Sequence, residues 1–246
     1  MRRAFPLLLL LAAFSFPAFA HDPDAEPEPD PLWQGTAGLS FLATGGNTDT
    51  QSFGVDLGFE RLPDPWGLSI VARFNRAEED GVTTAERYIA GLRGSRTLND
   101  RWSYFAGLQG EQDEFAGIDL RLVAETGVVY NALLGPEHLL SFDLGLTWTD
   151  EDRVPPNPDV DFIGGILGLD YAWKISESAT FTERLLVYPN FDESDDWRFD
   201  SLTALTAALS ERYAIQLGYE IRYRNEPIGD NDDTDTLARA SLVVNF

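Results

Sequence analysis

The stretch Tyr213–Tyr223 reads Tyr-Ala-Ile-Gln-Leu-Gly-Tyr-Glu-Ile-Arg-Tyr and decides the fold, because large apolar residues alternate with polar or small ones. Successive side chains of a β-strand point to opposite faces, so this order gives one apolar and one polar face. The apolar spacing of an amphipathic helix is not followed. The last segment repeats the pattern, with one face formed by Ala238, Ala240, Leu242, Val244 and Phe246.

Segments of this kind recur twelve times from Trp33 to the last residue. Most are longer than ordinary soluble strands and close to the ~9 to 11 residues that a tilted strand needs to cross a bilayer. We therefore predict an all-β fold: a closed antiparallel up-and-down transmembrane β-barrel of about 12 strands with both termini periplasmic. The segments are 33–43, 51–61, 66–76, 86–97, 101–111, 119–131, 138–149, 161–174, 179–188, 198–209, 212–224 and 235–246. Glu183 and Asp200 blur the alternation in the ninth and tenth.

The predicted connections alternate in length. Those after even-numbered segments are tight, such as Leu62–Pro65 and Ser210–Glu211. Those after odd-numbered segments are mostly longer and acidic, namely Ala77–Gly81, Asp150–Asp159, Asn190–Asp196 and Asn225–Asp233. Short turns at one rim and long loops at the other are typical of the periplasmic and extracellular ends of an outer-membrane barrel.

Aromatic residues fall at the segment ends beside the short turns. Amphipathic rings favour the headgroup level of a membrane, so we interpret this set as a girdle at the periplasmic interface, although bulky rings can also end soluble strands. The set is Trp33, Trp66, Trp102, Tyr130, Trp173, Tyr213 and Phe246.

The N-terminus has the layout of an export signal. Arg2 and Arg3 precede an apolar run around Leu7–Leu11, and Ala18-Phe19-Ala20 forms a cleavage site. A membrane anchor is the alternative, but the run is shorter than the ~20 residues that span a bilayer. We expect residues 1–20 to be a cleaved signal peptide, residues 21–32 a disordered, acidic, proline-rich lead-in, and residues 33–246 the barrel.

Composition narrows the classes further. The formal charge of the chain is -23, and there are no cysteines, so no disulfide framework supports an exported protein. Such acidity disfavours nucleic acid as a partner. No later segment has 18 consecutive apolar residues, which excludes a helical membrane protein and leaves export to the outer membrane of a Gram-negative cell as the expected location.

Several motifs resemble one family. Phe246 after an alternating strand resembles the C-terminal signature of bacterial outer-membrane barrels, which implies the barrel assembly machinery as a partner. The opening Trp33-Gln34-Gly35, Leu39-Ser40 and 44–52 resembles the start of the DUF481 family, which includes salt-induced outer-membrane proteins. Arg121, 125–127, 171–173 and 188–190 also fit, so the resemblance covers the mature chain, with a departure at the doubled Gly45-Gly46. It implies a barrel of poorly defined role, with no catalytic or ligand residues to carry over.

Chemistry at the outer rim would need a histidine or another base near neutral pKa. The two histidines are His21 in the lead-in and His138 at a predicted periplasmic turn. We therefore expect no enzyme activity, no catalytic residues and no cofactor.

Carboxylates crowd the predicted outer loops and are the kind of ligand that Ca²⁺ or Mg²⁺ takes. The densest run, Asp230–Asp235, lacks the glycine and the glutamate that an EF-hand loop needs, so a solvated acidic loop is the favoured interpretation and metal binding stays open. The loop carboxylates are Asp49, Asp80, Asp150, Asp152, Asp159, Asp230, Asp232 and Asp233.

The predicted inward face carries both signs of charge. Interleaved signs favour cross-strand pairs that fill and stiffen the interior, whereas a ring of one sign would favour an ion-selective pore. The inward set is Asp56, Glu60, Arg73, Arg93, Glu111, Arg121, Glu125, Asp143, Asp170, Glu220, Arg222 and Arg239.

Three functional alternatives remain at this point. The first is a non-enzymatic barrel in envelope integrity or salt adaptation, surrounded by outer-membrane lipid. The second is a narrow, cation-preferring channel or transport barrel for a small cationic solute, since carboxylates outnumber arginines in the inward set. The third is a soluble periplasmic sandwich or lipocalin-like carrier, whose strands also alternate.

Overall fold

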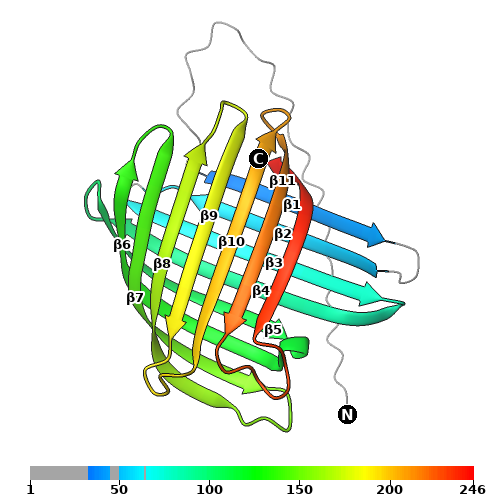
Figure 1. Ribbon diagram of the computed structural model, residues 1–246. Coiled ribbons are helices and arrows are strands. Elements are labelled where there is room, and N and C mark those ends of the chain that lie inside the picture. Colours follow the sequence, from blue (N-terminus) through cyan, green and yellow to red (C-terminus); the bar gives the residue numbers. More distant parts are fainter. Residues whose placement is uncertain (1–32, 45–49, 64) are drawn as a thin grey trace, which may run out of the picture. The chain divides into compact units, whose positions relative to one another are not determined.

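The computed structural model describes residues 33–44, 50–63 and 65–246, and within them the chain forms a closed antiparallel barrel (Figure 1). Each strand pairs with its neighbours in sequence, and β12 returns to pair with β1. The predicted fold class is therefore confirmed. The strands are β1 Trp33–Thr44, β2 Thr50–Arg61, β3 Trp66–Glu79, β4 Val82–Thr97, β5 Trp102–Asp113, β6 Ile118–Leu134, β7 His138–Arg153, β8 Val160–Lys174, β9 Ala179–Pro189, β10 Trp197–Ala208, β11 Tyr213–Arg224 and β12 Thr234–Asn245. A short 3-10 helix, η1 Glu114–Ala116, follows β5.

The barrel wall is apolar outside and polar inside. On β7, Leu144 and Leu146 are 59% and 56% exposed, whereas Asp143 and Thr147, which flank them in sequence, are each 5% exposed. The same order holds on β11, where Leu217 faces outward. A soluble sandwich or carrier would bury the apolar face, so the third alternative is wrong.

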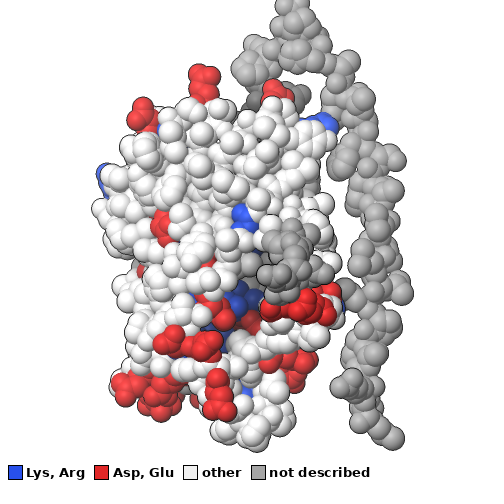
Figure 2. All heavy atoms as spheres, turned by 45° about the vertical axis from the view of Figure 1, so that its right-hand side comes forward, with Lys and Arg blue, Asp and Glu red and all other residues white. Residues whose placement is uncertain are grey.

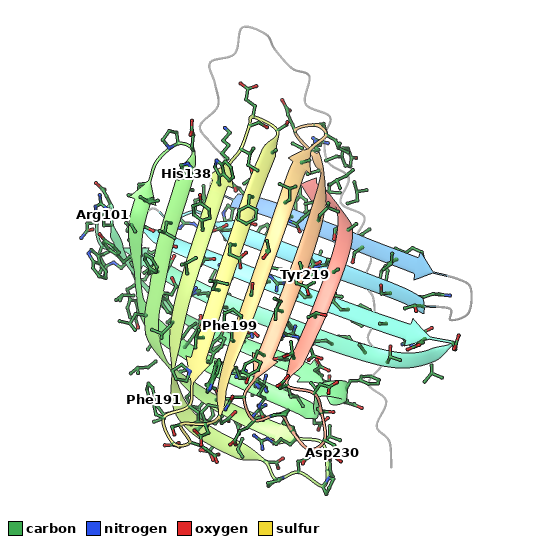
Figure 3. All side chains as sticks on the ribbon, viewed as in Figure 1. Arg101, His138, Phe191, Phe199, Tyr219 and Asp230 are labelled. Atoms are coloured by element: carbon green, nitrogen blue, oxygen red, sulfur yellow. The ribbon has the colours of Figure 1, made fainter. Side chains whose placement is uncertain are left out.

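The connections segregate by length. Those after β2, β4, β6, β8 and β10 are turns of three or four residues at one end, and the longer loops after β7, β9 and β11 lie at the other end (Figure 1). Figure 3 shows this polarity, with Arg101 and His138 at the end with the turns and Phe191 and Asp230 at the end with the loops. We call these the turn end and the loop end.

Two predicted loops are shorter than expected. The prediction of an acidic loop at 77–81 is wrong. β3 and β4 continue until only Asp80 and Gly81 remain between them, with φ of 49° and 77°. Asp-Gly in this conformation suits the tight turn of a β-hairpin, which explains the difference. The predicted loop 150–159 is also partly wrong, because β7 runs to Arg153 and places Asp150 and Asp152 on a strand.

The aromatic residues predicted as a girdle all lie at the turn end, and six of them are exposed on the outer surface. Tyr130 is half-buried, with its ring 4.9 Å from that of Trp102. His138 stacks on the rings of Tyr171 and Trp173 at the same end.

The C-terminal residue closes the barrel. The backbone N–H of Gly35 donates to the carbonyl oxygen of Phe246 at 2.7 Å, and the N–H of Phe246 donates back to Gly35 at 2.9 Å. A Cβ at Gly35 would collide with the ring of Phe246, so the glycine lets this ring lie against the backbone of β1.

The described residues include no helix with the length and apolar character needed to cross a membrane. The proposed signal peptide and lead-in, residues 1–32, and His21 with them, lie outside the described part of the chain.

Candidate functional site

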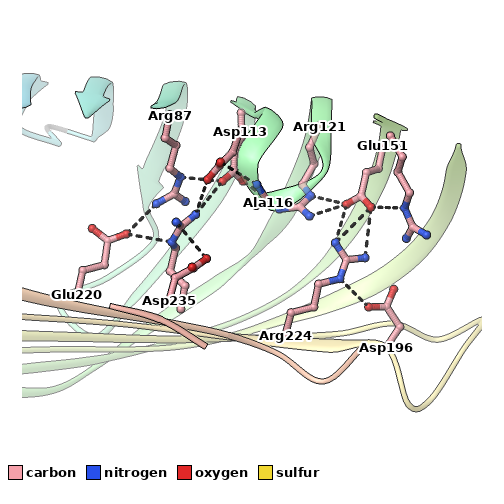
Figure 4. Close-up of polar contacts among 12 residues, drawn as sticks. Arg87, Asp113, Ala116, Arg121, Glu151, Asp196, Glu220, Arg224 and Asp235 are labelled. Atoms are coloured by element: carbon pink, nitrogen blue, oxygen red, sulfur yellow. Dashed lines mark hydrogen bonds and ion pairs between the residues drawn. The ribbon is translucent and has the colours of Figure 1, made fainter. Parts of the chain in front are cut away.

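The candidate site is the polar interior of the barrel in the half nearer the loop end. Period-two alternation turns every second residue of a strand inward, and here those residues are arginines, aspartates and glutamates from seven strands, joined by Asp196 from the β9–β10 loop. Their ion pairs form one chain of alternating sign, which we call the cross-lumen network; Figure 4 shows its part from Glu220 to Asp196. In order along the chain of contacts its members are Asp56, Arg239, Glu220, Arg87, Glu111, Arg121, Glu151, Arg224 and Asp196, with Arg222 and Asp113 beside Glu111.

The network joins opposite walls of the barrel. β11 lies directly opposite β5 in the ring of strands, yet Arg222 Nη1 on β11 is 3.1 Å from Asp113 Oδ2 on β5. Arg87 Nη1 on β4 is 2.8 Å from Glu220 Oε1 on β11. Because these side chains meet across the lumen, they bridge it at this level.

Glu151 on β7 accepts hydrogen bonds from more arginines than any other carboxylate of the network. It is 1% exposed and accepts from Arg121 at 2.6 Å, from Arg153 at 2.7 Å and from Arg224 at 3.2 Å. A carboxylate can accept several charge-assisted hydrogen bonds, and the planar guanidinium groups are suited to donate them. Glu151 therefore ties β6, β7 and β11 together.

A smaller cluster lies nearer the turn end. Arg93 Nη2 on β4 is 2.7 Å from Asp143 Oδ2, and Arg93 Nε is 3.2 Å from Glu125 Oε1. The same guanidinium lies 3.6 Å from the centre of the Phe105 ring. Asp170 and Arg184 pair between neighbouring strands at 2.5 Å.

Most of the predicted inward set takes part in these contacts, and Arg73 joins through Asp56 at 3.6 Å. Glu60 differs, because it is exposed near the turn end and no ion pair involves it among the described residues. Glu151 was not predicted to face the lumen because the sequence pattern places it in a loop. The other inward residues that were not predicted are Arg87, Asp113, Arg153, Arg184, Arg198, Asp200 and Arg224. These additional inward residues include more arginines than carboxylates, so the excess of carboxylates over arginines in the lumen is smaller than predicted.

Two inward charges on β10 stand apart from the network. Arg198 and Asp200 face the lumen, and neither makes an ion pair within 4.0 Å or a hydrogen bond to any residue in the described part of the chain. The guanidinium of Arg198 lies 4.8 Å from the centre of the Tyr188 ring. A strand advances about 6.5 Å over two residues, so the two groups are neighbours on one face, and their opposite charges interact electrostatically beyond ion-pair distance.

Glu183, the other residue that blurred the alternation, faces outward. It pairs in register with Thr203 and Tyr171, and the neighbours of Tyr171 on the same face, Leu169 and Trp173, are apolar. Its carboxylate accepts from Ser201 Oγ at 2.8 Å and from Thr203 Oγ1 at 2.5 Å. The hydroxyl groups of β10 thus compensate a charge on the apolar surface.

The loop carboxylates do not assemble a metal centre among the residues that the structure describes, and Asp49 lies outside them. Carboxylates gather at the loop end in Figure 2, below a wall that is mostly uncharged.

A protein family matches this architecture. The profile of the family described as "Protein of unknown function, DUF481" matches residues 37–246. This chain belongs to the DUF481 family. The resemblance predicted from the sequence motifs is thereby confirmed. Another protein similar to this DUF481 chain is the uncharacterized protein YdiY of Escherichia coli (strain K12), which is 24% identical over 206 residues, covering 84% of this chain and 79% of YdiY.

Solved structures similar to this DUF481 barrel are outer-membrane proteins. The COG4313 outer membrane channel from Pseudomonas putida F1 superposes with a TM-score of 0.53 at 12% identity, over 93% of this chain and 100% of the channel. The NanC porin superposes with a TM-score of 0.50 at 12% identity, over 87% of this chain and 97% of the porin. At this identity the likeness establishes the fold, an outer-membrane-type β-barrel, and no solute.

Proposed function

We propose that this chain is a non-enzymatic protein of the outer membrane that contributes to envelope integrity or to salt adaptation, with a lumen bridged by charge pairs. One observation carries the proposal: the cross-lumen network connects opposite walls through Arg222, Asp113, Arg87 and Glu220. Ion pairs at this level fill and stiffen the interior, which suits a barrel that holds the envelope together more than one that conducts freely.

The surface supports an outer-membrane location. Leucine, phenylalanine and tryptophan side chains are exposed on the wall, where water would disfavour them and lipid would not. We infer that this lipid is one partner and that the barrel assembly machinery, acting on the strand that ends at Phe246, is another. The placement predicts extraction only with detergent, and faster gel migration for the unheated protein than for the boiled protein.

The absence of enzyme activity is inferred from the position of His138. It lies at the turn end, opposite the acidic loops (Figure 3), and stacks on Trp173 with ring centres 5.9 Å apart. A hydrolase of the outer rim would need its general base at the loop end.

Conductance of the refolded protein in planar bilayers tests the proposal. The native protein is expected to give no resolved steps, while Arg222→Ala combined with Arg224→Ala is expected to raise conductance by opening the bridged layer. Arg184→Ala is the matched control, because this lumen arginine pairs only between neighbouring strands. Large, steady steps from the native protein would overturn the proposal.

A narrow cation-preferring channel is the second candidate, and the acidic loop end favours it. Carboxylates at the mouth of a pore concentrate cations locally. This candidate predicts small steps from the native protein whose reversal potential in a salt gradient indicates cations.

The cellular role is tested in a strain that lacks the chain. Envelope integrity predicts greater uptake of an excluded dye, with a larger defect at raised NaCl, and recovery when the chain is supplied again. Unchanged uptake in both media would contradict that role.

A further inference from the structure

The barrel is closed by an unusually short ladder between its first and last strands. β1 and β12 pair over Thr36–Ser40 and Ser241–Asn245, fewer residues than any other neighbouring strands share. Beyond Ser40 and Ser241 both strands continue toward the loop end, to Thr44 and Thr234, without pairing to each other. The wall is therefore open between β1 and β12 in the part nearer the loop end, and we call this opening the seam.

The seam lies partly within the depth of a membrane. The paired part spans about six residues, or roughly 20 Å along the strand and about 15 Å along the barrel axis at a tilt near 40°. The apolar band of an outer-membrane barrel is about 25 Å tall, so the seam would extend over roughly the 10 Å of this band nearest the loop end. Unpaired strand edges are costly in lipid unless a polar group or water reaches them.

A cavity of about 350 Å³ passes through the seam. Its lining includes side chains from both faces of each strand: Phe41 outward and Leu42 inward on β1, Ala240 outward and Leu237 inward on β12. A cavity inside an intact wall would meet inward side chains alone. In Figure 2 blue arginine atoms lie within a hollow on the side of the barrel.

The loop end of the lumen is covered. The β11–β12 loop places Ile228, only 5% exposed, against Gly117, which follows η1 on the opposite wall. Gly229 of the same loop approaches the side chain of Asn157 between β7 and β8. Loops that meet across the mouth obstruct the axial route, so the seam is the more open path to the cavity.

The cavity lining matches an amphiphile. Leu42 and Leu237 interrupt the polar interior with apolar side chains at the seam, which suits an alkyl chain. The cavity lining also includes Arg198 and Asp200, the two charges of β10 that make no ion pair within 4.0 Å among the described residues. A head group that carries both an anion and a cation satisfies both, whereas a head group of one sign leaves the other repelled.

We propose that the seam is a lateral binding site for a single-chain zwitterionic amphiphile of the lysophospholipid class. Arg198 binds its phosphate and Asp200 its ammonium group, while the chain leaves between β1 and β12. The inference rests on the membrane placement proposed above. The gel-mobility assay tests that placement separately, so a protein that shows the mobility shift but binds nothing refutes this inference alone.

Binding is measured by titration calorimetry of the full barrel in amphipol, with 1-lauroyl-lysophosphatidylethanolamine as the probe. Laurate and dodecyltrimethylammonium, which carry one charge each, serve as comparison ligands. The proposal predicts the tightest binding for the zwitterion and at least a tenfold weaker affinity in Arg198→Gln, with Arg184→Gln as control. Equal affinities for the three ligands, or an unchanged affinity in Arg198→Gln, would overturn it. If Arg198→Gln fails to fold, Asp200→Asn tests the same head-group site.

The route is tested by closing the seam after folding. The chain has no cysteine, so Phe41→Cys with Ala240→Cys introduces a single pair at the next position of the ladder. Oxidation is expected to block binding when it precedes the probe and to slow release when it follows. Reduction restores exchange. Ala37→Cys with Val244→Cys, within the paired ladder, is the control that leaves exchange unchanged. If oxidation of the seam pair also leaves exchange unchanged, the lateral route is wrong.

Discussion

Replacing Glu151 by glutamine should destabilise the barrel more than any other single charge removal in the lumen. The variant keeps the shape of the side chain but removes the negative charge that three arginines share, at 2.6, 2.7 and 3.2 Å. Breaking a buried ion pair costs about 3–5 kcal/mol, because the partner charge stays buried without compensation. The glutamine can still accept one hydrogen bond, so we expect a loss of about 3 kcal/mol in the free energy of unfolding.

The matched control is Asp170→Asn. This carboxylate also pairs with an arginine in the lumen, but the side chains of Asp170 and Arg184 are 32% and 49% exposed. Exposed pairs contribute about 0–1 kcal/mol, so the control should lose less than 1 kcal/mol. Both variants are unfolded in guanidinium from detergent micelles, with tryptophan fluorescence and gel mobility as independent readouts of the transition.

The comparison decides whether the network holds the walls together. A midpoint for Glu151→Gln that falls well below that of Asp170→Asn, with an unchanged denaturant slope, supports the reasoning. Equal midpoints would refute it, since they would mean that water compensates the arginines when the carboxylate is lost.

Three further outcomes are expected. Gly127→Ala should abolish the fast-migrating folded form on a gel, because its Cβ would overlap the backbone of Leu144, whereas Gly94→Ala, whose nearest contact would be 3.9 Å away, should fold. Glu183→Leu should raise the free energy of unfolding by about 1 kcal/mol or less, and with it the denaturation midpoint, since it removes a charge from the apolar outer surface. A lower midpoint would contradict the outward placement of Glu183. Deleting Phe246 should lower the yield of folded barrel in liposomes, because two backbone hydrogen bonds of the closing ladder are lost; an unchanged yield would show that Ser40 and its neighbours close the barrel alone.

Period-two alternation predicted the strands because every strand of a barrel wall has one apolar face turned outward and one polar face turned inward. It predicted the face of Asp143 and Leu144 correctly for that reason. The same rule fails where a strand extends beyond the apolar band of the wall, as in the β3–β4 hairpin and at the end of β7. There both faces are polar, so Glu151 looked like part of a loop.

The partners within the lumen could not be predicted from the sequence. Alternation gives the face of a residue but not the residue opposite it, and Arg222 meets Asp113 across the ring from β11 to β5. The seam left a weak signal, since Leu42 and Leu237 are apolar residues at inward positions. Glu183 left a stronger one, a carboxylate on an apolar face, but the hydroxyl groups that compensate it come from the next strand.

The central claim is that the leucine-rich face of the wall meets lipid and the charged face meets the lumen. The chain has no cysteine, so single cysteines at the outward Phe142 and at its inward neighbour Ser141 can each carry a fluorophore in liposomes of brominated phospholipid. Strong quenching is expected at position 142 and weak quenching at position 141. Equal quenching at the two positions, or the reverse order, would contradict it.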